Sequence, residues 1–385
     1  MRTAKIWVSV LVIVVVLVIA ERIIVPPIIE KSMNKIVDVS DYSVSPAADK
    51  LHSSLKIVDW HADSLLWSRD FLKRSDYGQV DLPRLQDGNI NLQVMTTVTK
   101  SPEGQNYEEN TGSSDSITKL AIAQGWPVRT WNSLLERALY QSDLLHTYVA
   151  KSKGQMVFVK NKADLAAHRN RDNGAIAVML GTEGGHPFEG DIKNVDIMYN
   201  AGFRMVGLTH FFDNKLAGSL HGVSKAGLTD FGRAVVKRLD ELNIIIDLAH
   251  SSEATAWEVL SLTTRPVVIS HTGLKGYCDT ARNYPDTLMK AIAEKGGLIA
   301  IGYWDAAVCD TSPTAIAGAI KYGIDLVGAD HIALGSDWDG AVTALASDHI
   351  STITEALIQA GVPEADIRKV MGENSLKFLQ TWLPD

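Results

Sequence analysis

Polar side chains follow short apolar runs at several points along the chain. His61 and Asp63 come directly after one such run and stand two residues apart. In extended backbone both side chains therefore emerge on one face, where an imidazole and a carboxylate can share a divalent metal ion. His250 and His271 each follow a further apolar run and could hold a second ion, and Glu183 falls between the two pairs and is suited to bridge them. The pattern predicts a two-metal site with ions roughly 3.5–4 Å apart.

The elements that must position these residues alternate regularly. Short runs rich in β-branched and aliphatic residues are separated by amphipathic stretches of helical length. The runs predict eight strands at 56–60, 90–98, 175–180, 204–208, 244–248, 267–270, 298–303 and 331–335. Helical patterns between them include 131–150, 231–242, 252–260 and 286–294. Continuous apolar runs are typical of parallel strands buried on both faces.

Eight strand–helix units predict an α/β fold, a (β/α)8 TIM-type barrel. A doubly wound sheet is the competitor, but its first strand usually leads into a glycine-rich phosphate loop, whereas here it leads into His61-Ala62-Asp63. Catalytic groups of such barrels lie at the carboxyl ends of the strands. His210 and Asp337 also follow predicted strands, so the sequence predicts one polar rim that carries the metal site.

The remaining seven histidines fall in predicted helices, in loops or at a strand start. They are interpreted as ordinary surface or loop histidines, with His186 and His221 the least certain of them. The seven are His52, His146, His168, His186, His221, His331 and His349.

The N-terminus predicts export. Arg2 and Lys5 precede an apolar run from 6 to 20, whose helical length of about 22 Å falls short of a bilayer core of about 30 Å. This length is typical of a signal peptide, although apolar residues at 23–25 favour an uncleaved anchor. We predict a signal peptide or membrane anchor at 1–25 and a catalytic domain in the periplasm or outside the cell.

Two further segments complete the predicted organisation. Residues 26–54 are predicted to be a tether with a short helix, which starts at Ser45-Pro46 because serine is a good N-cap and proline fits the first helical turn. Residues 55–385 are predicted to form the barrel domain.

Composition excludes some classes of protein. The hydrophobic content of 46%, the charged content of 21% and the net charge of −8 describe a globular chain. No block of Lys and Arg follows the N-terminal region, so nucleic-acid binding is not expected. Cys278 and Cys309 lack the spacing of a metal finger and could either form one disulfide or stay apart.

These residues resemble the membrane (renal-type) dipeptidase family of zinc peptidases, within the amidohydrolase-like barrels. The resemblance runs from about Ile57 to Leu379. Its most specific segments are 58–63, 180–184, 208–210, 227–232, 246–251, 269–271, 281–286 and 335–340. The sequence departs from better-known members at Ala62, where they carry asparagine, and at Gly302-Tyr303-Trp304, which puts side-chain preference in doubt rather than the chemistry.

The resemblance implies a dipeptidase with two Zn²⁺ ions per chain. A hydroxide held between the ions would attack the peptide carbonyl, because metal binding lowers the pKa of water from 15.7 to roughly 7. It also implies tolerance of a D-residue at the second position, and family members are commonly homodimers. The implied roles are metal binding by His61, Asp63, Glu183, His250 and His271, contact with the substrate carbonyl by His210, binding of the substrate carboxylate by Arg282, and proton transfer by Asp337.

Three alternatives remain beside this interpretation. A related barrel hydrolase could act on a lactam, a phosphoester or another amide, although no strand-end lysine offers a carbamylated metal bridge. A membrane-tethered binding protein on an inactive barrel is disfavoured by the intact ligand set. A serine hydrolase and a thermolysin-like peptidase lack their motifs, G-x-S-x-G and H-E-x-x-H.

Overall fold

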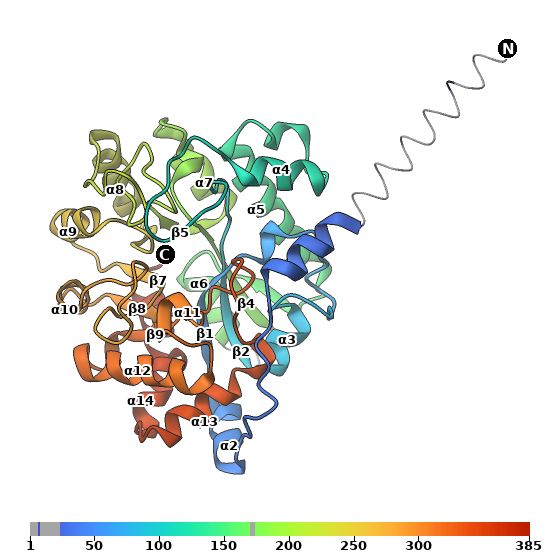
Figure 1. Ribbon diagram of the computed structural model, residues 1–385, viewed down its shortest axis with the longest axis vertical. Coiled ribbons are helices and arrows are strands. Elements are labelled where there is room, and N and C mark those ends of the chain that lie inside the picture. Colours follow the sequence, from blue (N-terminus) through green and yellow to red (C-terminus); the bar gives the residue numbers. More distant parts are fainter. Residues whose placement is uncertain (1–6, 8–23, 170–173) are drawn as a thin grey trace.

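The computed structural model describes residue 7, residues 24–169 and residues 174–385 (Figure 1). Most of the predicted signal peptide or anchor at 1–25 lies outside these ranges. Within the described ranges, no helix combines the length and the apolar character needed to cross a bilayer.

Eight parallel strands form a closed barrel, as predicted. The barrel strands are β1 Ile57–Ala62, β2 Ile90–Met95, β4 Ile176–Thr182, β5 Phe203–Gly207, β6 Ile245–Asp247, β7 Val268–Thr272, β8 Leu298–Ile301 and β9 Ile332–Leu334. The pairing order runs from β2 through β1, β9, β8, β7, β6 and β5 to β4, and a β2–β4 pairing closes the ring. A ninth, three-residue strand, β3 (Met156–Phe158), pairs outside the ring with Ile176–Val178 and was not predicted.

Helices surround the barrel, and the predicted ones are all present within a few residues (Figure 1). Ser45 caps α2 by accepting a hydrogen bond from the backbone of Ala48, and Pro46 occupies the first turn. The helices are α2 Pro46–Ser54, α3 Leu82–Asp87, α4 Ser116–Ala123, α5 Leu134–Lys151, α6 Lys162–Arg169, α7 Lys193–Ala201, α8 Asp230–Glu241, α9 Glu253–Leu262, α10 Asp286–Glu294, α11 Asp305–Val308, α12 Pro313–Val327, α13 Ser351–Gln359, α14 Glu364–Arg368 and α15 Asn374–Trp382.

The core consists of two main apolar layers. One cluster takes buried residues from all eight barrel strands together with residues of α15. A larger cluster joins strand residues to the surrounding helices. Both faces of the strands are therefore buried, which explains why their sequences are continuous apolar runs rather than alternating ones.

The segment that we expected to be a polar tether is instead docked on the barrel. Residues 24–33 are helical. Glu30 is buried and pairs with Arg69 over 2.6 Å, and the Asn34 side chain accepts a hydrogen bond of 2.8 Å from the backbone of Ala341. Specific polar contacts of this kind are not visible in a single sequence, which is why composition alone indicated a tether.

Cys278 and Cys309 form a disulfide, which decides between the two options that the sequence left open. The bond joins the loop after β7 to the end of α11, the short helix that follows β8. It therefore links two loops on the rim that carries the candidate site.

Candidate metal centre

All eight predicted site residues meet at the carboxyl end of the barrel. His61 and His271 lie at the ends of β1 and β7, and the others lie in the segments that follow strands. These are Asp63 after β1, Glu183 after β4, His210 after β5, His250 after β6, Arg282 in the loop between β7 and α10, and Asp337 after β9. Each of these residues is buried.

Glu183 is the centre of the cluster. Its Oε1 atom lies 3.1 Å from His250 Nε2, 3.2 Å from His271 Nε2 and 3.7 Å from His61 Nε2. Its Oε2 atom lies 3.2 Å from His210 Nε2. The next residue, Gly184, has a φ of 82°, a left-handed turn that glycine adopts without steric cost and that begins the loop behind the carboxylate.

Two groups of side chains around Glu183 could each hold a metal ion. The first group is His61, Asp63 and Glu183, and the second is Glu183, His250 and His271. In each group the ligand atoms lie within 4.8 Å of one another. Both groups share Glu183.

The electrostatics of the cluster fit divalent cations. Burial raises the pKa of Glu183 well above its usual range, and neighbouring Asp63 raises it further. Burial opposes a charge on His61, but Asp63, Glu183 and Asp337 raise its pKa to about 10. Three buried carboxyl groups around one imidazole can all ionise only with compensating positive charge, which bound cations would supply.

The two remaining imidazoles are suited to donate lone pairs. Burial lowers the pKa values of His250 and His271 well below the usual range, so both rings are neutral. Their Nε2 atoms face each other at 2.9 Å, and His61 Nε2 has no hydrogen-bond partner among the described residues. Neutral imidazole nitrogens gathered beside carboxylates are the ligand types that zinc prefers.

A single serine hydroxyl organises the ring nitrogens that face away from Glu183. Ser270 Oγ donates to Asp247 Oδ2 over 2.6 Å and lies 3.1 Å from His61 Nδ1 and 2.9 Å from His271 Nδ1. Because its one proton goes to Asp247, the hydroxyl must accept from both imidazoles. Both Nδ1 atoms are thereby fixed as N–H donors, so a metal ion would bind each ring through its Nε2 atom.

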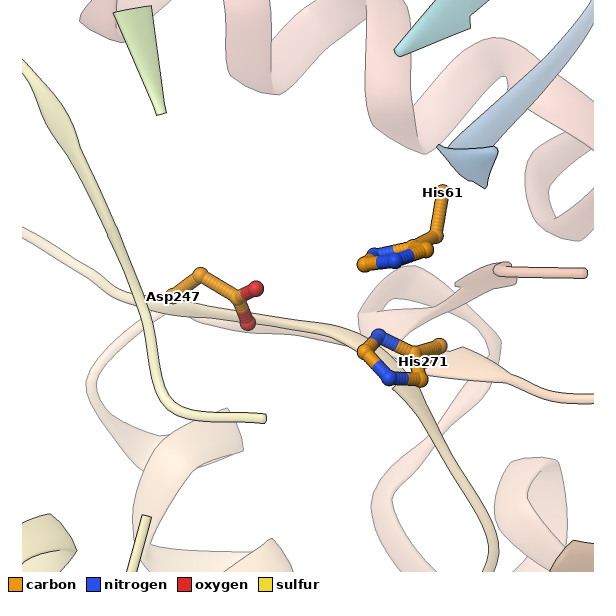
Figure 2. Close-up of side chains that lie close together, drawn as sticks. All are labelled: His61, Asp247 and His271. Carbon is orange, nitrogen blue, oxygen red and sulfur yellow. The ribbon is translucent and has the colours of Figure 1, made fainter. Parts of the chain in front are cut away.

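Figure 2 shows the Asp247 carboxylate directed toward the imidazoles of His61 and His271. These three side chains also lie close enough together to resemble a metal site. The Ser270 hydroxyl is hydrogen-bonded to all three of them, so we interpret this trio as a support for the ligands rather than as a third ion site.

Arg282 is buried with part of its guanidinium unused. Its Nη2 donates to the carbonyl of His271 over 2.6 Å and lies 3.5 Å from His250 Nε2. Nε and Nη1 have no hydrogen-bond partner among the described residues. Trp304 packs against the guanidinium, 5.3 Å from its ring centroid. Buried donors without partners are costly, so this arrangement favours an anionic ligand.

Asp337 and His210 complete the rim. Asp337 Oδ1 lies 3.9 Å from His61 Nε2, and burial raises the pKa of Asp337 to about 8. Its φ of 60° is uncommon for a residue with a side chain, and such strained backbone is concentrated at functional sites. Burial lowers the pKa of His210 to about 4, so this imidazole is neutral.

One tryptophan and one aspartate near the rim have supporting positions. Trp338 is fully buried and donates to the carbonyl of Leu345 over 2.8 Å. Asp339 accepts from Ser64 over 2.8 Å and pairs with Arg69, so it shapes the loop that carries Asp337.

Sequence reasoning missed His221, Ser270 and Asp247. The His221 ring lies 5.1 Å from the His250 ring, and its Nε2 atom has no hydrogen-bond partner among the described residues. His221 lies in the long loop between β5 and α8, where no strand end marks it. Ser270 and Asp247 lie within predicted strands, so only their proximity to His61 and His271 identifies them.

A cavity of about 330 Å³ opens beside the cluster. Five of the predicted residues, Asp63, Glu183, His210, His250 and Asp337, lie in its polar wall. The remaining lining is mostly apolar and comes from the N-terminal helical segment, α4 and loops of the rim. A barrel with clustered imidazole and carboxylate ligands beside such a cavity defines a metal-dependent hydrolase.

Comparisons with known proteins assign the family. The membrane dipeptidase family, peptidase family M19, matches residues 46–382. The chain belongs to this family and is a metallo-dipeptidase, which confirms the resemblance inferred from the motifs.

Individual relatives agree with the family. The chain is similar to dipeptidase aclJ of Aspergillus oryzae, with 27% identity over 86% of this chain and 79% of that protein. Among solved structures it is similar to the dipeptidase AC, a metallo peptidase of family M19, with a TM-score of 0.73, 20% identity and coverage of 86% of this chain and 99% of that one. A metallo peptidase from Rhodobacter sphaeroides, liganded with a phosphinate mimic of the dipeptide L-Ala-D-Ala, also gives a TM-score of 0.73 and 20% identity, over 85% and 99% of the two chains. At this identity, the two structures support the fold.

Proposed function

We propose that this dipeptidase binds two Zn²⁺ ions in the cluster around Glu183. His61 and Asp63 would hold one ion, His250 and His271 the other, and Glu183 would bridge them. The observation that carries the proposal is the position of Glu183 Oε1, within 3.7 Å of the Nε2 atoms of all three histidines. When bound, the ions supply the Lewis acidity that activates water and polarises the scissile carbonyl.

Arg282 would bind the carboxylate of the substrate. Its free Nε and Nη1 atoms can make charge-assisted hydrogen bonds to a terminal carboxylate. Because Arg282 Nη2 lies 3.5 Å from His250 Nε2, a carboxylate bound to Arg282 would be separated from the scissile peptide bond by a single residue. This spacing restricts the enzyme to short substrates.

Asp337 and His210 would handle the proton and the developing charge. The pKa of Asp337, raised to about 8 by burial, suits a carboxylate that takes a proton from water and returns it to the leaving amine. His210, whose neutral ring lies with Nε2 3.2 Å from Glu183 Oε2, would donate a hydrogen bond to the oxygen of the carbonyl under attack in the tautomer that carries its proton on Nε2.

Three finer properties belong to the same proposal. Tolerance of a D-residue at the second position is supported by the Rhodobacter sphaeroides relative with its L-Ala-D-Ala mimic. Export, with residues 1–25 as an anchor or a cleaved signal peptide, is supported by the apolar run at 6–20. A homodimer is an expectation from the family.

The alternatives differ in measurable ways. A related enzyme for another amide or a lactam would bind the same metals but leave dipeptides intact. An inactive binding protein would bind dipeptides without turnover. The buried free donors of Arg282 beside the cluster favour a substrate with a carboxylate over a lactam or another amide that lacks one, and measured turnover would exclude the inactive binding protein.

A dipeptide-library assay before and after chelation, with restoration of zinc, tests the proposal. We expect activity to disappear with the metal and to return with zinc, at a measured content of two ions per chain. Glu183→Ala should fold but lose one or both ions and nearly all turnover. Wild-type turnover in this variant would refute the bridging role. Equal rates on L,L- and L,D-dipeptides would support tolerance of a D-residue, and the absence of L,D-dipeptide cleavage would refute that tolerance.

A further inference from the structure

Part of the wall of the active-site cavity comes from outside the family's matched region. Ile29 and Met33 of the helical segment 24–33 line the cavity, while the family match begins at residue 46. The family likeness therefore predicts nothing about these two side chains.

Polar contacts fix this segment to the rim. Arg69 joins Glu30 to Asp339, in the loop after β9 that also carries Asp337. Asn34 accepts a hydrogen bond from the backbone of Ala341 in the same loop. The side chains of Glu30, Arg69 and Asp339 are all buried. The segment is therefore held in place as a defined wall of the cavity.

Ile29 extends an apolar surface that reaches the metal cluster. It packs against a buried cluster that includes Leu66, Trp67 and Val98. The same cavity is also lined by Ile117 and Leu120 of α4 and, deeper, by Asp63, Glu183 and Asp337. An apolar group attached to the scissile peptide would therefore be removed from water here, which is favourable in proportion to its area.

The positions of the charged groups decide which end of a dipeptide faces this wall. The free donors of Arg282 lie beside His250 and His271, on the β7 side. The wall is fixed to the loop that follows β9, the neighbour of β1, on the side of His61 and Asp63. A dipeptide with its carboxylate on Arg282 consequently directs its amino-terminal residue toward Ile29 and Met33.

We propose that this enzyme selects dipeptides with a bulky apolar amino-terminal residue, and that Ile29 and Met33 form the part of the cavity that sets this preference. The inference rests on the proposed dipeptidase chemistry, because the direction of the substrate depends on Arg282. It names a substrate class, with leucine and phenylalanine preferred to glycine and alanine at the amino-terminal position.

The test compares Leu-Ala and Phe-Ala with Gly-Ala in the zinc-loaded full chain. Ile29→Trp fills the part of the cavity beside this wall. It should lower the ratio of kcat/KM for Leu-Ala over Gly-Ala about 10-fold or more, mainly through KM. A single methylene in such a pocket changes specificity by about 10–200-fold. The double variant Ile29→Ser, Met33→Ser removes apolar contact and should lower the same ratio. Ile28→Trp is the matched control, because Ile28 is 60% exposed on the same helix and does not line the cavity.

A binding measurement separates this inference from the proposed function. Calorimetry with a Leu-Ala analogue whose peptide bond is reduced to an amine reports affinity without turnover, and metal analysis shows that each variant keeps its ions. A loss of affinity of about 10-fold in Ile29→Trp, but not in Ile28→Trp, supports the wall. Unchanged ratios and affinities, or equal losses for Leu-Ala and Gly-Ala, overturn it. If the wild-type enzyme cleaves no dipeptide, the proposed function fails, and the calorimetric comparison then decides the inference by itself.

Discussion

Replacing Ser270 with alanine should weaken metal binding although Ser270 is not itself a ligand. The hydroxyl donates to Asp247 and accepts from His61 and His271, and neither Nδ1 atom has another hydrogen-bond partner within residues 24–169 and 174–385. Ser270→Ala therefore leaves two buried N–H groups and one carboxylate oxygen without partners. An unsatisfied buried polar group costs about 1–3 kcal/mol.

Bound ions are affected because the two rings lose the group that sets their tautomer. Each ring can then place its proton on Nε2, whose lone pair is needed to bind the metal. Loss of such a supporting contact lowers metal affinity by about 10–100-fold, or about 1.4–2.7 kcal/mol. Both ion sites should weaken, because His61 belongs to one group and His271 to the other.

Competition with a chelating dye would measure the two zinc dissociation constants, and mass spectrometry would give metal content after dialysis. Ser251→Ala is the matched control, since Ser251 is buried beside His250 and its hydroxyl has no hydrogen-bond partner in the described part of the chain. The reasoning is refuted if Ser270→Ala binds zinc as tightly as the wild type does. It is also refuted if Ser251→Ala weakens binding equally, because a general packing defect would then explain both.

Three further predictions follow from the charged residues. Asp337→Asn should keep both ions and lose about 10²–10⁴ in kcat, the usual contribution of proton transfer; loss of zinc with the activity would show that Asp337 acts as a ligand instead. Arg282→Lys should raise KM for Leu-Ala about 10–100-fold, because lysine lacks the planar fork, and an equal rise for Leu-Ala amide, which has no carboxylate, would contradict the assignment. For Glu30, burial raises the pKa to about 7 although Arg69 opposes the shift. The folded state therefore holds this proton between about pH 4.5 and 7 while the unfolded state releases it, so the free energy of unfolding should fall by about 3 kcal/mol as the pH rises through this range. Urea denaturation at pH 5 and pH 8 should show that Glu30→Gln removes this part of the pH dependence; an unchanged difference would contradict it.

The barrel could be predicted because its strands are buried on both faces. Burial of this kind requires unbroken apolar runs such as 175–180, which are visible in a single sequence. The ligands were visible for a related reason. A polar residue directly after an apolar strand, such as His271, has no role in the core and lies at the rim where chemistry is expected.

The features that could not be predicted from the sequence depend on contacts between distant segments. Ser270 is an ordinary strand residue until the fold brings Asp247 and His61 to its hydroxyl. The segment 24–33 looks like a tether because Glu30 is polar, and only its pairing with Arg69, 39 positions away, turns it into a wall of the cavity. His221 comes from a loop whose path no local pattern fixes.

The bond between Cys278 and Cys309 has a consequence for how the enzyme matures. The two cysteines are 31 positions apart, and the covalent ring that they close contains Arg282 as well as β8. In the entropic model of crosslinks, closing a ring of this size raises the free energy of the unfolded chain by about 3–4 kcal/mol. Enzyme produced in a reducing cell would lack this restraint near the Arg282 guanidinium. We expect it to bind the carboxylate of its substrate more weakly than enzyme that has been oxidised before use.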